Sequence, residues 1–363
     1  MKKKWRILLA AVICTAMAAG CSSPSGGNSG TQITQSGTEQ KAEEETVESK
    51  GDEAAAQEEQ EPVTLKLSTT TTPGTVFVDS FHELADTVNQ KTGGKVTIEV
   101  YDSSQLGAEQ DVLANVIDGV IDMIGTVGTG VLTEYAPEFG VFDTPYLFES
   151  YEDFEKFQQS DTAAAFEKRA GDKVGDVVVT GMINMGVRSY MEDKRPVVTP
   201  EDLKGLKIRT PQQETIMSTV EAMGAVPTPM APTELYLSIQ QGVVDGAEHA
   251  PSGQKAFNVQ EVCKYYIKTE HARQVVFAVI SQNALDKLTP ENQKILLDTW
   301  KEIEVSCSRA CEEEDGKIIE EFEKDNGVEI IEPDKAAFEE VLQPVIEKLK
   351  LSDPEVYEAI KGN

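Results

Sequence analysis

The feature that most restricts the fold of this chain is an alternation of strand and helix patterns that occurs twice. In the first run, residues 63–70 (VTLKLSTT) place apolar side chains at every second position, which is typical of a strand. Residues 77–88 then place them at helical spacing, and Gly93-Gly94 ends that helix. A strand at KVTIEVY, a second helix over 112–120 and a short buried strand at VIDMIGTV follow. This order predicts a β-α-β-α-β unit.

The same order returns further along the chain. LKGLKIRT is a predicted strand that ends at Arg209, and a helical stripe over 216–223 closes at Gly224. AVPTPM is extended, ELYLSIQQ is a helix with Thr233 as its N-cap and Gly242 at its end, and VVDGAEH is the last strand. The segments VIDGVIDM and IQQGVVDG correspond, because in both a glycine ends a helix and two apolar β-branched residues enter the sheet.

Two such units predict an α/β fold with two Rossmann-like lobes joined by a hinge. Residues 177–190 (VVVTGMINMGVRSY) are predicted to cross between the lobes, and a helix from Thr289 to about Asp325 is predicted to brace both. In open α/β sheets, ligands bind beyond the carboxyl ends of the strands, so two facing edges predict one crevice. The candidate edge residues are Thr69 to Thr71, Tyr101 to Gln105, Thr126 to Gly128, Arg209 to Gln212, Pro229 to Pro232, and Glu248-His249.

The first 21 residues have the pattern of a bacterial lipoprotein signal peptide. MKKKWR is basic, and ILLAAVICTAMAAG is an apolar stretch of about 14 residues, which is too short to span a membrane. The stretch leads to Ala18-Ala19-Gly20-Cys21, which resembles a lipobox, so Cys21 is the predicted lipidation site. A lipid on Cys21 would anchor the protein to a membrane without spanning it. The alternative is an ordinary signal with an incidental cysteine.

Residues 22–62 are predicted to be a disordered acidic tether, because they hold almost nothing apolar. This segment has ten acids and two lysines, a net charge of −8, and the signal peptide adds four positive residues. Because the whole chain has a formal charge of −30, the remainder carries about −26. Such a surface excludes nucleic acid as a partner and requires that an anionic ligand be held by a few well-placed cations.

The sequence argues against an enzyme, because no GxSxG, HExxH, Walker or GxGxxG motif occurs in a suitable context. His82 is expected at the surface, and His271, which precedes an apolar strand, is expected to be structural. Cys263, Cys307 and Cys311 are expected to be packed thiols; the alternative is that the last two, one helical turn apart, form half a metal site. We therefore expect no catalytic residue, no cofactor and no metal.

Arg209 is the main candidate for ligand binding. It ends an apolar alternation just before Thr210-Pro211, which places a guanidinium at the carboxyl end of a strand and facing the crevice. The planar guanidinium can donate two parallel hydrogen bonds to one carboxylate. Arg188, which follows the crossing strand, is the candidate for a second cation. Aromatic side chains that would stack on a neutral sugar are sparse, so an organic anion is the predicted ligand.

A series of motifs resembles the TRAP-transporter (tripartite ATP-independent periplasmic) solute-binding proteins of the DctP type. The motifs are GGKVTIEVYDSSQLGAE, GVIDM, DTPYLF, GVR, TPEDLKGLKIRTP, MGAVPTPM and ELYLSIQQGVVDGAEH, and they lie between about residues 63 and 350. The resemblance implies a periplasmic-binding-protein-like fold of class II with a long helix shared by the lobes. It also implies a receptor that closes on a small organic acid and delivers it to a sodium-coupled permease.

The resemblance implies that Arg209 pairs with the ligand carboxylate, that Arg188 assists and that Gln212 lines the site. His249 departs from the family pattern, in which an asparagine is common, and Pro232 stands where an aromatic residue is common. His249 could donate to a second carboxylate or titrate near neutral pH; alternatively, it replaces one hydrogen-bonding side chain with another. A C4-dicarboxylate, a sugar acid and a keto acid therefore all remain as ligands.

The predicted organisation is a signal peptide (1–21), a tether (22–62), lobe I (63–186 plus about 274–312) and lobe II (187–273 plus about 313–363). The predicted ligand-binding residues are Arg209, Arg188, Gln212, His249, Thr70 and Thr126. We expect a lipid-anchored monomer at the extracytoplasmic face of the cell membrane, with TRAP permease subunits as partners. The alternatives are a receptor that feeds a signalling partner and a hydrolase with a degenerate motif.

Overall fold

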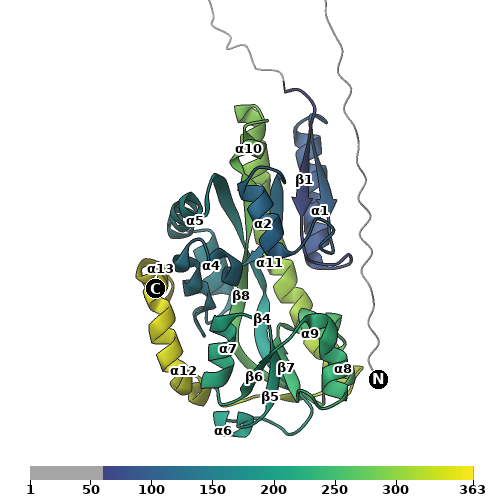
Figure 1. Cartoon of the computed structure of the whole chain (residues 1–363), viewed down its shortest axis with the longest axis vertical. Coiled ribbons are helices and arrows are strands. Elements are labelled where there is room, and N and C mark those ends of the chain that lie inside the picture. The colour runs from purple at the N-terminus through teal and green to yellow at the C-terminus, as the bar shows by residue number, and fades with distance from the viewer. Residues whose placement is uncertain (1–59, 363) are drawn as a thin grey trace, which may run out of the picture. The chain divides into compact units, whose positions relative to one another are not determined.

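The structure is a computed structural model that describes residues 60–362. Its framework is one mixed sheet of nine strands in the order β2-β1-β3-β8-β4-β7-β5-β6, with β9 paired to β8 (Figure 1). The strands are β1 Val63–Ser68, β2 Val96–Tyr101, β3 Met123–Gly128, β4 Val177–Glu192, β5 Lys207–Thr210, β6 Val226–Pro229, β7 Gly246–His249, β8 Tyr265–Ser281 and β9 Glu329–Ile331.

Helices flank this sheet (Figure 1). The α-helices are α1 Val76–Lys91, α2 Glu109–Ile117, α3 Thr129–Leu132, α4 Tyr151–Gln158, α5 Asp161–Val174, α6 Pro200–Leu203, α7 Glu214–Ala222, α8 Leu235–Gln240, α9 Pro251–Ala256, α10 Gln282–Leu285, α11 Pro290–Lys324, α12 Lys335–Leu349 and α13 Pro354–Lys361. The short 3₁₀ helices are η1 Pro137–Asp143, η2 Pro232–Glu234, η3 Val259–Glu261 and η4 Lys350–Ser352.

Two parallel half-sheets occupy the two ends of the sheet. β1 pairs in parallel with β2 and β3, and β5 pairs in parallel with β6 and β7. The long antiparallel pair β4 and β8 lies between them, because β8 also pairs with β3 and β4 also pairs with β7. We call the first half-sheet with its helices lobe I and the second lobe II. The prediction that residues 177–190 cross between the lobes is therefore confirmed.

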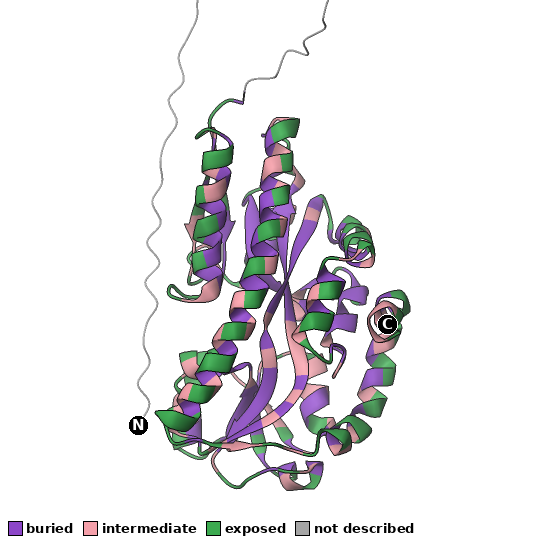
Figure 2. Cartoon of the chain, turned by 180° about the vertical axis from the view of Figure 1, so that it is seen from behind, coloured by how far each residue is buried: buried purple, intermediate pink, exposed green. Residues whose placement is uncertain are grey.

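Each lobe has apolar clusters on both faces of the sheet, as the side chains of β8 illustrate. Phe277 and Val279 belong to one cluster of lobe I, whereas Ala278 and Ile280 belong to the other. Successive strand residues point to opposite faces, so a strand that is covered on both sides needs a continuous apolar run. The same division holds in lobe II, where Tyr190 lies in one cluster and Met191 lies in the other. Figure 2 shows the strands of the sheet mostly buried beneath helices whose outer faces are exposed.

The helix α11 is 35 residues long and is shared by both lobes, as predicted. It begins at the predicted N-cap Thr289, whose hydroxyl accepts a hydrogen bond from the backbone N–H of Asn292. Trp300 lies in a core cluster of lobe I, and Phe322 lies in a core cluster of lobe II. At 1.5 Å per residue, the helix extends for about 52 Å, which is enough to brace both halves.

The strands that follow Gly119 and Gly242 begin later in the chain than predicted. Gly119 and Gly242 do end their helices, with φ of +70° and +71°. However, Val243 is 50% exposed, and β7 begins only at Gly246, because the residues just after a left-handed glycine still belong to the turn. The predicted N-cap at Thr233 is also wrong, since this residue lies inside η2 and α8 begins at Leu235.

Two predicted boundaries shift. Gln60, which was assigned to the tether, is buried, and its Oε1 accepts a hydrogen bond of 2.7 Å from the backbone N–H of Thr289 at the start of α11. The C-terminal helix α13, which was predicted in lobe II, packs mainly on lobe I, and its Tyr357 also packs against a core cluster of lobe II. Val356 of α13 joins a core cluster of lobe I, and Asp353 forms a 2.5 Å ion pair with Arg169 of α5.

The predicted signal peptide, Cys21 and most of the predicted tether lie outside the described residues. Across residues 60–362, none of the helices combines the length and apolar character needed to cross a membrane.

Candidate functional site

A cavity of about 1000 Å³ lies between the two lobes, and it is lined by all six residues predicted to bind a ligand. In lobe I, Thr70 follows β1 and Thr126 lies on β3, and Arg188 lies on the crossing strand β4. In lobe II, Arg209 is the last residue but one of β5, Gln212 follows β5, and His249 ends β7. The prediction that the carboxyl ends of strands from both lobes share one crevice therefore agrees with the geometry.

Arg209 is almost fully buried at the end of β5, with 3% of its surface exposed. Its Nε and Nη2 donate hydrogen bonds of 3.2 and 2.9 Å to the backbone carbonyl of Met230. Burial lowers the pKa of Arg209 to about 10. The carboxylate of Glu248 partly opposes this shift, and the cation of Arg188 adds to it. The guanidinium stays charged at neutral pH, and the cost of its burial makes an anion in the cavity favourable.

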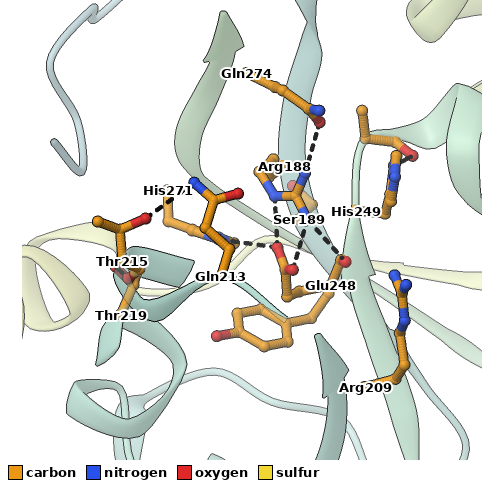
Figure 3. Close-up of polar contacts among 12 residues, drawn as sticks. Arg188, Ser189, Arg209, Gln213, Thr215, Thr219, Glu248, His249, His271 and Gln274 are labelled. Atoms are coloured by element: carbon orange, nitrogen blue, oxygen red, sulfur yellow. Dashed lines mark hydrogen bonds and ion pairs between the residues drawn. The ribbon is translucent and has the colours of Figure 1, made fainter. Parts of the chain in front are cut away.

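Arg188, the candidate for a second ligand-binding cation, already has an acidic partner within the protein. Its Nε and Nη2 donate to the two carboxylate oxygens of Glu248 at 2.7 and 2.6 Å, and its Nη1 donates to Oε1 of Gln274 at 2.5 Å (Figure 3). Burial disfavours the ionised carboxylate of Glu248, but Arg188 and His271 outweigh this cost and lower its pKa to about 2. Arg188 and Glu248 therefore form a closed ion pair, which sequence reasoning missed because 60 residues separate the partners.

The position of Arg188 depends on a glycine two residues before it. Gly186 has φ of +97°, a region that side chains rarely adopt. A Cβ at this position would lie 2.1 Å from Oδ2 of Asp315 on α11, so only glycine permits this close approach. The β4–β8 register shifts across Gly186, between Asn184 and Val187, and shifts again between Arg188 and Tyr190. Such irregularities bend a strand and redirect its side chains, here at the point where β4 passes between the lobes.

The pKa of His249 lies well below neutral pH, which favours the alternative that this residue acts as a neutral hydrogen-bonding side chain. Burial and, to a lesser degree, the cation of Arg188 lower its pKa to about 3. The ring packs edge-on against Phe257 at 5.8 Å between centroids, and its Nδ1 lies 3.3 Å from the carbonyl oxygen of Ala250. That contact favours a proton on Nδ1, which leaves Nε2 as a hydrogen-bond acceptor.

The wall from lobe I carries hydroxyl groups and a carboxylate. The hydroxyl of Thr69 lies 2.9 Å from those of Thr71 and Thr126, so these three side chains form one chain of hydrogen bonds. Oε1 of Glu109, at the start of α2, accepts a 2.7 Å hydrogen bond from the backbone N–H of Gly128. Burial raises the pKa of Glu109 above its ordinary value. This wall suits the hydroxyl groups of a ligand better than a second carboxylate.

A side chain that connects the lobes, which the sequence did not indicate, belongs to Gln213, the residue after the predicted site residue Gln212. Gln212 is exposed where it lines the cavity. Nε2 of Gln213 instead donates 3.0 Å hydrogen bonds to Oδ2 of Asp143 in lobe I and to the hydroxyl of Thr215. Asp143 belongs to the DTPYLF motif, which sequence analysis used for resemblance without assigning it a role.

The cavity-lining cations differ in whether they have an acidic partner. Arg188 pairs with Glu248, Arg273 pairs with Glu312 at 2.6 Å, and Lys348 lies 3.6 Å from Glu214. Arg209 has no ion-pair partner within residues 60–362. A buried guanidinium without a counter-ion, inside a cavity between two lobes, has the chemistry of an anion-binding site. The fold and the cavity thus define a two-lobed binding protein.

Comparison with known proteins assigns this binding protein to a family. Residues 67–353 match the family described as bacterial extracellular solute-binding protein, family 7 (DctP), and the chain belongs to this family. It is 33% identical over 286 residues to YiiZ, an uncharacterized protein of Salmonella typhimurium, with 77% of this chain and 84% of that protein covered. The predicted resemblance is therefore confirmed, and the relatives that carry functional names are solute-binding proteins.

Two further relatives have names that state a ligand. The C4-dicarboxylate-binding periplasmic protein DctP of Rhodobacter capsulatus is 28% identical over 299 residues, which cover 80% of this chain and 87% of that protein. The crystal structure of a TRAP periplasmic solute-binding protein from Sulfitobacter sp. NAS-14.1 contains bound β-D-galacturonate. It is similar to this chain with a TM-score of 0.73 and 29% identity, over 82% of this chain and 98% of that one.

Proposed function

We propose that this protein is the extracytoplasmic receptor of a TRAP transporter and that it captures a small organic acid by closure of its two lobes. The observation that carries the proposal is Arg209, a buried guanidinium without a counter-ion in the interlobe cavity. A ligand carboxylate would supply the missing negative charge through charge-assisted hydrogen bonds. The receptor would then deliver the acid to a sodium-coupled permease.

The ligand that suits this cavity best is a monocarboxylic acid with several hydroxyl groups, such as a hexuronate or another sugar acid. Arg209 supplies one free positive charge, whereas a dicarboxylate would need two. The opposite wall offers the carboxylate of Glu109 and the hydroxyls of Thr70 and Thr126. Neutral His249 adds an acceptor for a hydroxyl group. The galacturonate bound by the Sulfitobacter relative has this chemistry, which supports the choice over a C4-dicarboxylate.

A thermal-shift screen tests this function with galacturonate, glucuronate, succinate, malate and pyruvate. A true ligand at 100 times its Kd should add about 2.7 kcal/mol to the free energy of unfolding. Arg209→Ala should raise the Kd of that ligand by about 10- to 100-fold, because a charge-assisted hydrogen-bonding group is lost. Arg195→Ala is the matched control, since Arg195 is exposed and donates only to backbone carbonyls. No stabilisation by any acid, or equal effects of both substitutions, would contradict the proposal.

We also propose that lipid on Cys21 holds the receptor at the membrane and that residues 22–59 act as its tether. Lipidation would make the protein fractionate with membranes and add the mass of acyl chains to the mature N-terminus. Cys21→Ser should release the protein into the soluble fraction. Fractionation of the wild-type protein with the soluble proteins would contradict the anchor without affecting the ligand-binding proposal.

A further inference from the structure

The short helix α9, which follows His249 in the chain, lies beside α11 (Figure 1). It begins at Pro251, and its N-cap residue Ala250 has no side-chain oxygen that could accept a hydrogen bond from the first turn. Asp315 of α11 supplies such an acceptor, because its Oδ1 accepts a 3.0 Å hydrogen bond from the backbone N–H of Ser252. A carboxylate is favourable at this place, since the N-terminus of a helix carries a partial positive charge. Asp315 therefore holds the start of α9.

The helix α9 in turn supports the ring of His249. A Cβ added to Gly253 would lie 2.0 Å from Nδ1 of His249 and 2.1 Å from its Cε1, so the ring packs directly on the bare backbone of α9. Phe257, which follows α9, packs edge-on against the same ring. Nε2 of Gln254 donates hydrogen bonds of 3.0 Å to the backbone carbonyl of Ser189 and 3.1 Å to that of His249. The place of α9 therefore fixes the orientation of the His249 ring.

The second carboxylate oxygen of Asp315 reaches the strand that carries Arg188. Oδ2 occupies the place that a Cβ of Gly186 would take, two residues before Arg188 on β4. Asp315 itself is buried and does not line the cavity. Burial and, to a lesser degree, Glu312 raise the pKa of Asp315 to about 7, and either protonation state keeps an oxygen that can accept from Ser252. One buried side chain therefore contacts the strand before Arg188 and the helix after β7.

We propose that Asp315 is a positioning residue of the binding site, which holds Arg188 and His249 in place through the backbone of β4 and through α9. This role rests on the proposed function, because it takes Arg188 and His249 as parts of the ligand site. Loss of the Asp315 carboxylate should loosen the contact between α9 and the His249 ring. A loosely held binding group costs affinity, because the ligand must then order it.

The first test follows the His249 ring by NMR of protein that contains ¹⁵N-labelled histidine, whose ring-nitrogen signals distinguish the two neutral tautomers from the imidazolium form. The chain has three histidines, so the spectrum of His249→Gln assigns the signals. In the wild-type protein the ring should stay neutral from pH 8 to pH 5. In Asp315→Ala the ring should leave its place on α9 and titrate closer to the ordinary pKa of about 6.5, because it regains contact with water.

Three further variants separate positioning from a general loss of stability. Asp315→Asn keeps an acceptor for the N–H of Ser252 and should keep the wild-type histidine signals. Glu313→Ala, which removes an exposed acid from the same helix, should also leave them unchanged. Gly253→Ala inserts a methyl group where the ring packs, so it should shift the His249 signals although Asp315 is intact. Unchanged signals in folded Asp315→Ala would overturn the proposal, and unchanged signals in Gly253→Ala would do so even if Asp315→Ala does not fold.

The second test measures the Kd of an acid that the thermal-shift screen identifies. Asp315→Ala should raise this Kd by about tenfold, the effect of one weakened hydrogen bond to the ligand, and Asp315→Asn should raise it less. An unchanged Kd in Asp315→Ala, together with a released His249 ring, would overturn the positioning role. If no acid binds, the proposed function fails, whereas the histidine signals still decide whether Asp315 positions the ring.

Discussion

The ion pair of Arg188 and Glu248 places two opposite charges next to the cavity with less than a tenth of either side chain exposed. A buried pair of this kind adds little net stability, since desolvation offsets the attraction, but breaking it leaves one charge without a partner. The pair instead holds the side chain of Arg188 in one orientation. The two parallel hydrogen bonds fix the plane of the Arg188 guanidinium, which leaves Arg209 as the group that can respond to a ligand.

Removal of one partner of this pair should therefore be costly. Glu248→Gln should lower the free energy of unfolding by about 3–5 kcal/mol, because the guanidinium of Arg188 stays buried without its counter-ion. The measurement is urea unfolding of the ligand-free protein. Glu320→Gln is the control, since it removes an exposed partner of Lys324, and it should change the free energy of unfolding far less. Similar losses in the two variants would contradict the structural role of the pair.

The lowered pKa of His249 predicts how stability depends on pH. Its pKa is about 3 in the folded protein and about 6.5 in the unfolded chain, so the unfolded state takes up a proton between these values. The stability that neutral His249 provides is thus complete above pH 6.5 and is lost as the pH falls below it. Between pH 7.5 and pH 5, wild-type protein should lose about 1–2 kcal/mol more than His249→Gln, measured by urea unfolding. Equal losses would show that His249 titrates normally.

At the scale of elements, α11 and the β4–β8 pair connect the two lobes. The apolar side of α11 contributes to a core cluster in each lobe, and its Asp315 packs over the irregular part of β4 at Gly186. Asp143 of lobe I contacts Gln213 and Thr215 of lobe II at a different place, near the start of α7. The lobes are therefore connected by continuous elements at one place and by breakable side-chain contacts at another. This difference is what closure around a ligand requires.

The middle of α11 offers a direct test of its role as a brace. Gly316→Ala should raise the free energy of unfolding by about 0.5–1 kcal/mol, because alanine loses less backbone entropy in a helix and the added Cβ meets no neighbouring atom. Since α11 contributes to the cores of both lobes, unfolding of each lobe should shift to higher denaturant concentration together. Fluorescence of Trp300 reports on lobe I, and far-ultraviolet circular dichroism reports on the whole chain. Separate shifts would mean that the lobes unfold independently.

At the scale of the whole molecule, the field of the protein opposes the ligand that we propose. The chain after the tether carries about −26, while Arg209 is the one cavity-lining cation without an ion-pair partner among residues 60–362. Long-range repulsion therefore slows the approach of an anion, and the short-range contact with Arg209 retains it. Salt weakens the long-range repulsion more than it weakens the contact with Arg209, because the guanidinium is buried.

The association rate of an acid ligand should consequently rise with ionic strength. An increase from about 10 mM to about 150 mM salt shortens the Debye length from about 30 Å to about 8 Å, which weakens the repulsion from distant surface charges. Stopped-flow measurements should show a rate constant that rises severalfold, with a smaller change in the dissociation rate. A rate that falls with salt would mean that a local positive field steers the ligand instead.

Much of the architecture follows from local patterns in the sequence. The strand and helix periods of both lobes, the glycines that end α2 and α8, the cap at Thr289 and the crossing strand β4 all depend on residues near one another in the chain. The place of Arg209 at a strand end follows from the same patterns, because parallel strands present their carboxyl ends at one edge.

Only the tertiary structure decides which side chains are free and which are paired. Arg188 and Arg209 look alike in sequence, yet the register of β4 against β7 brings Glu248 to one of them and leaves the other without a counter-ion. Asp143 and Gln213 are likewise 70 residues apart and meet because the lobes face each other. Sequence determines local conformation through short-range sterics and periodicity, whereas charge pairing and burial depend on long-range contacts that form when the lobes pack together.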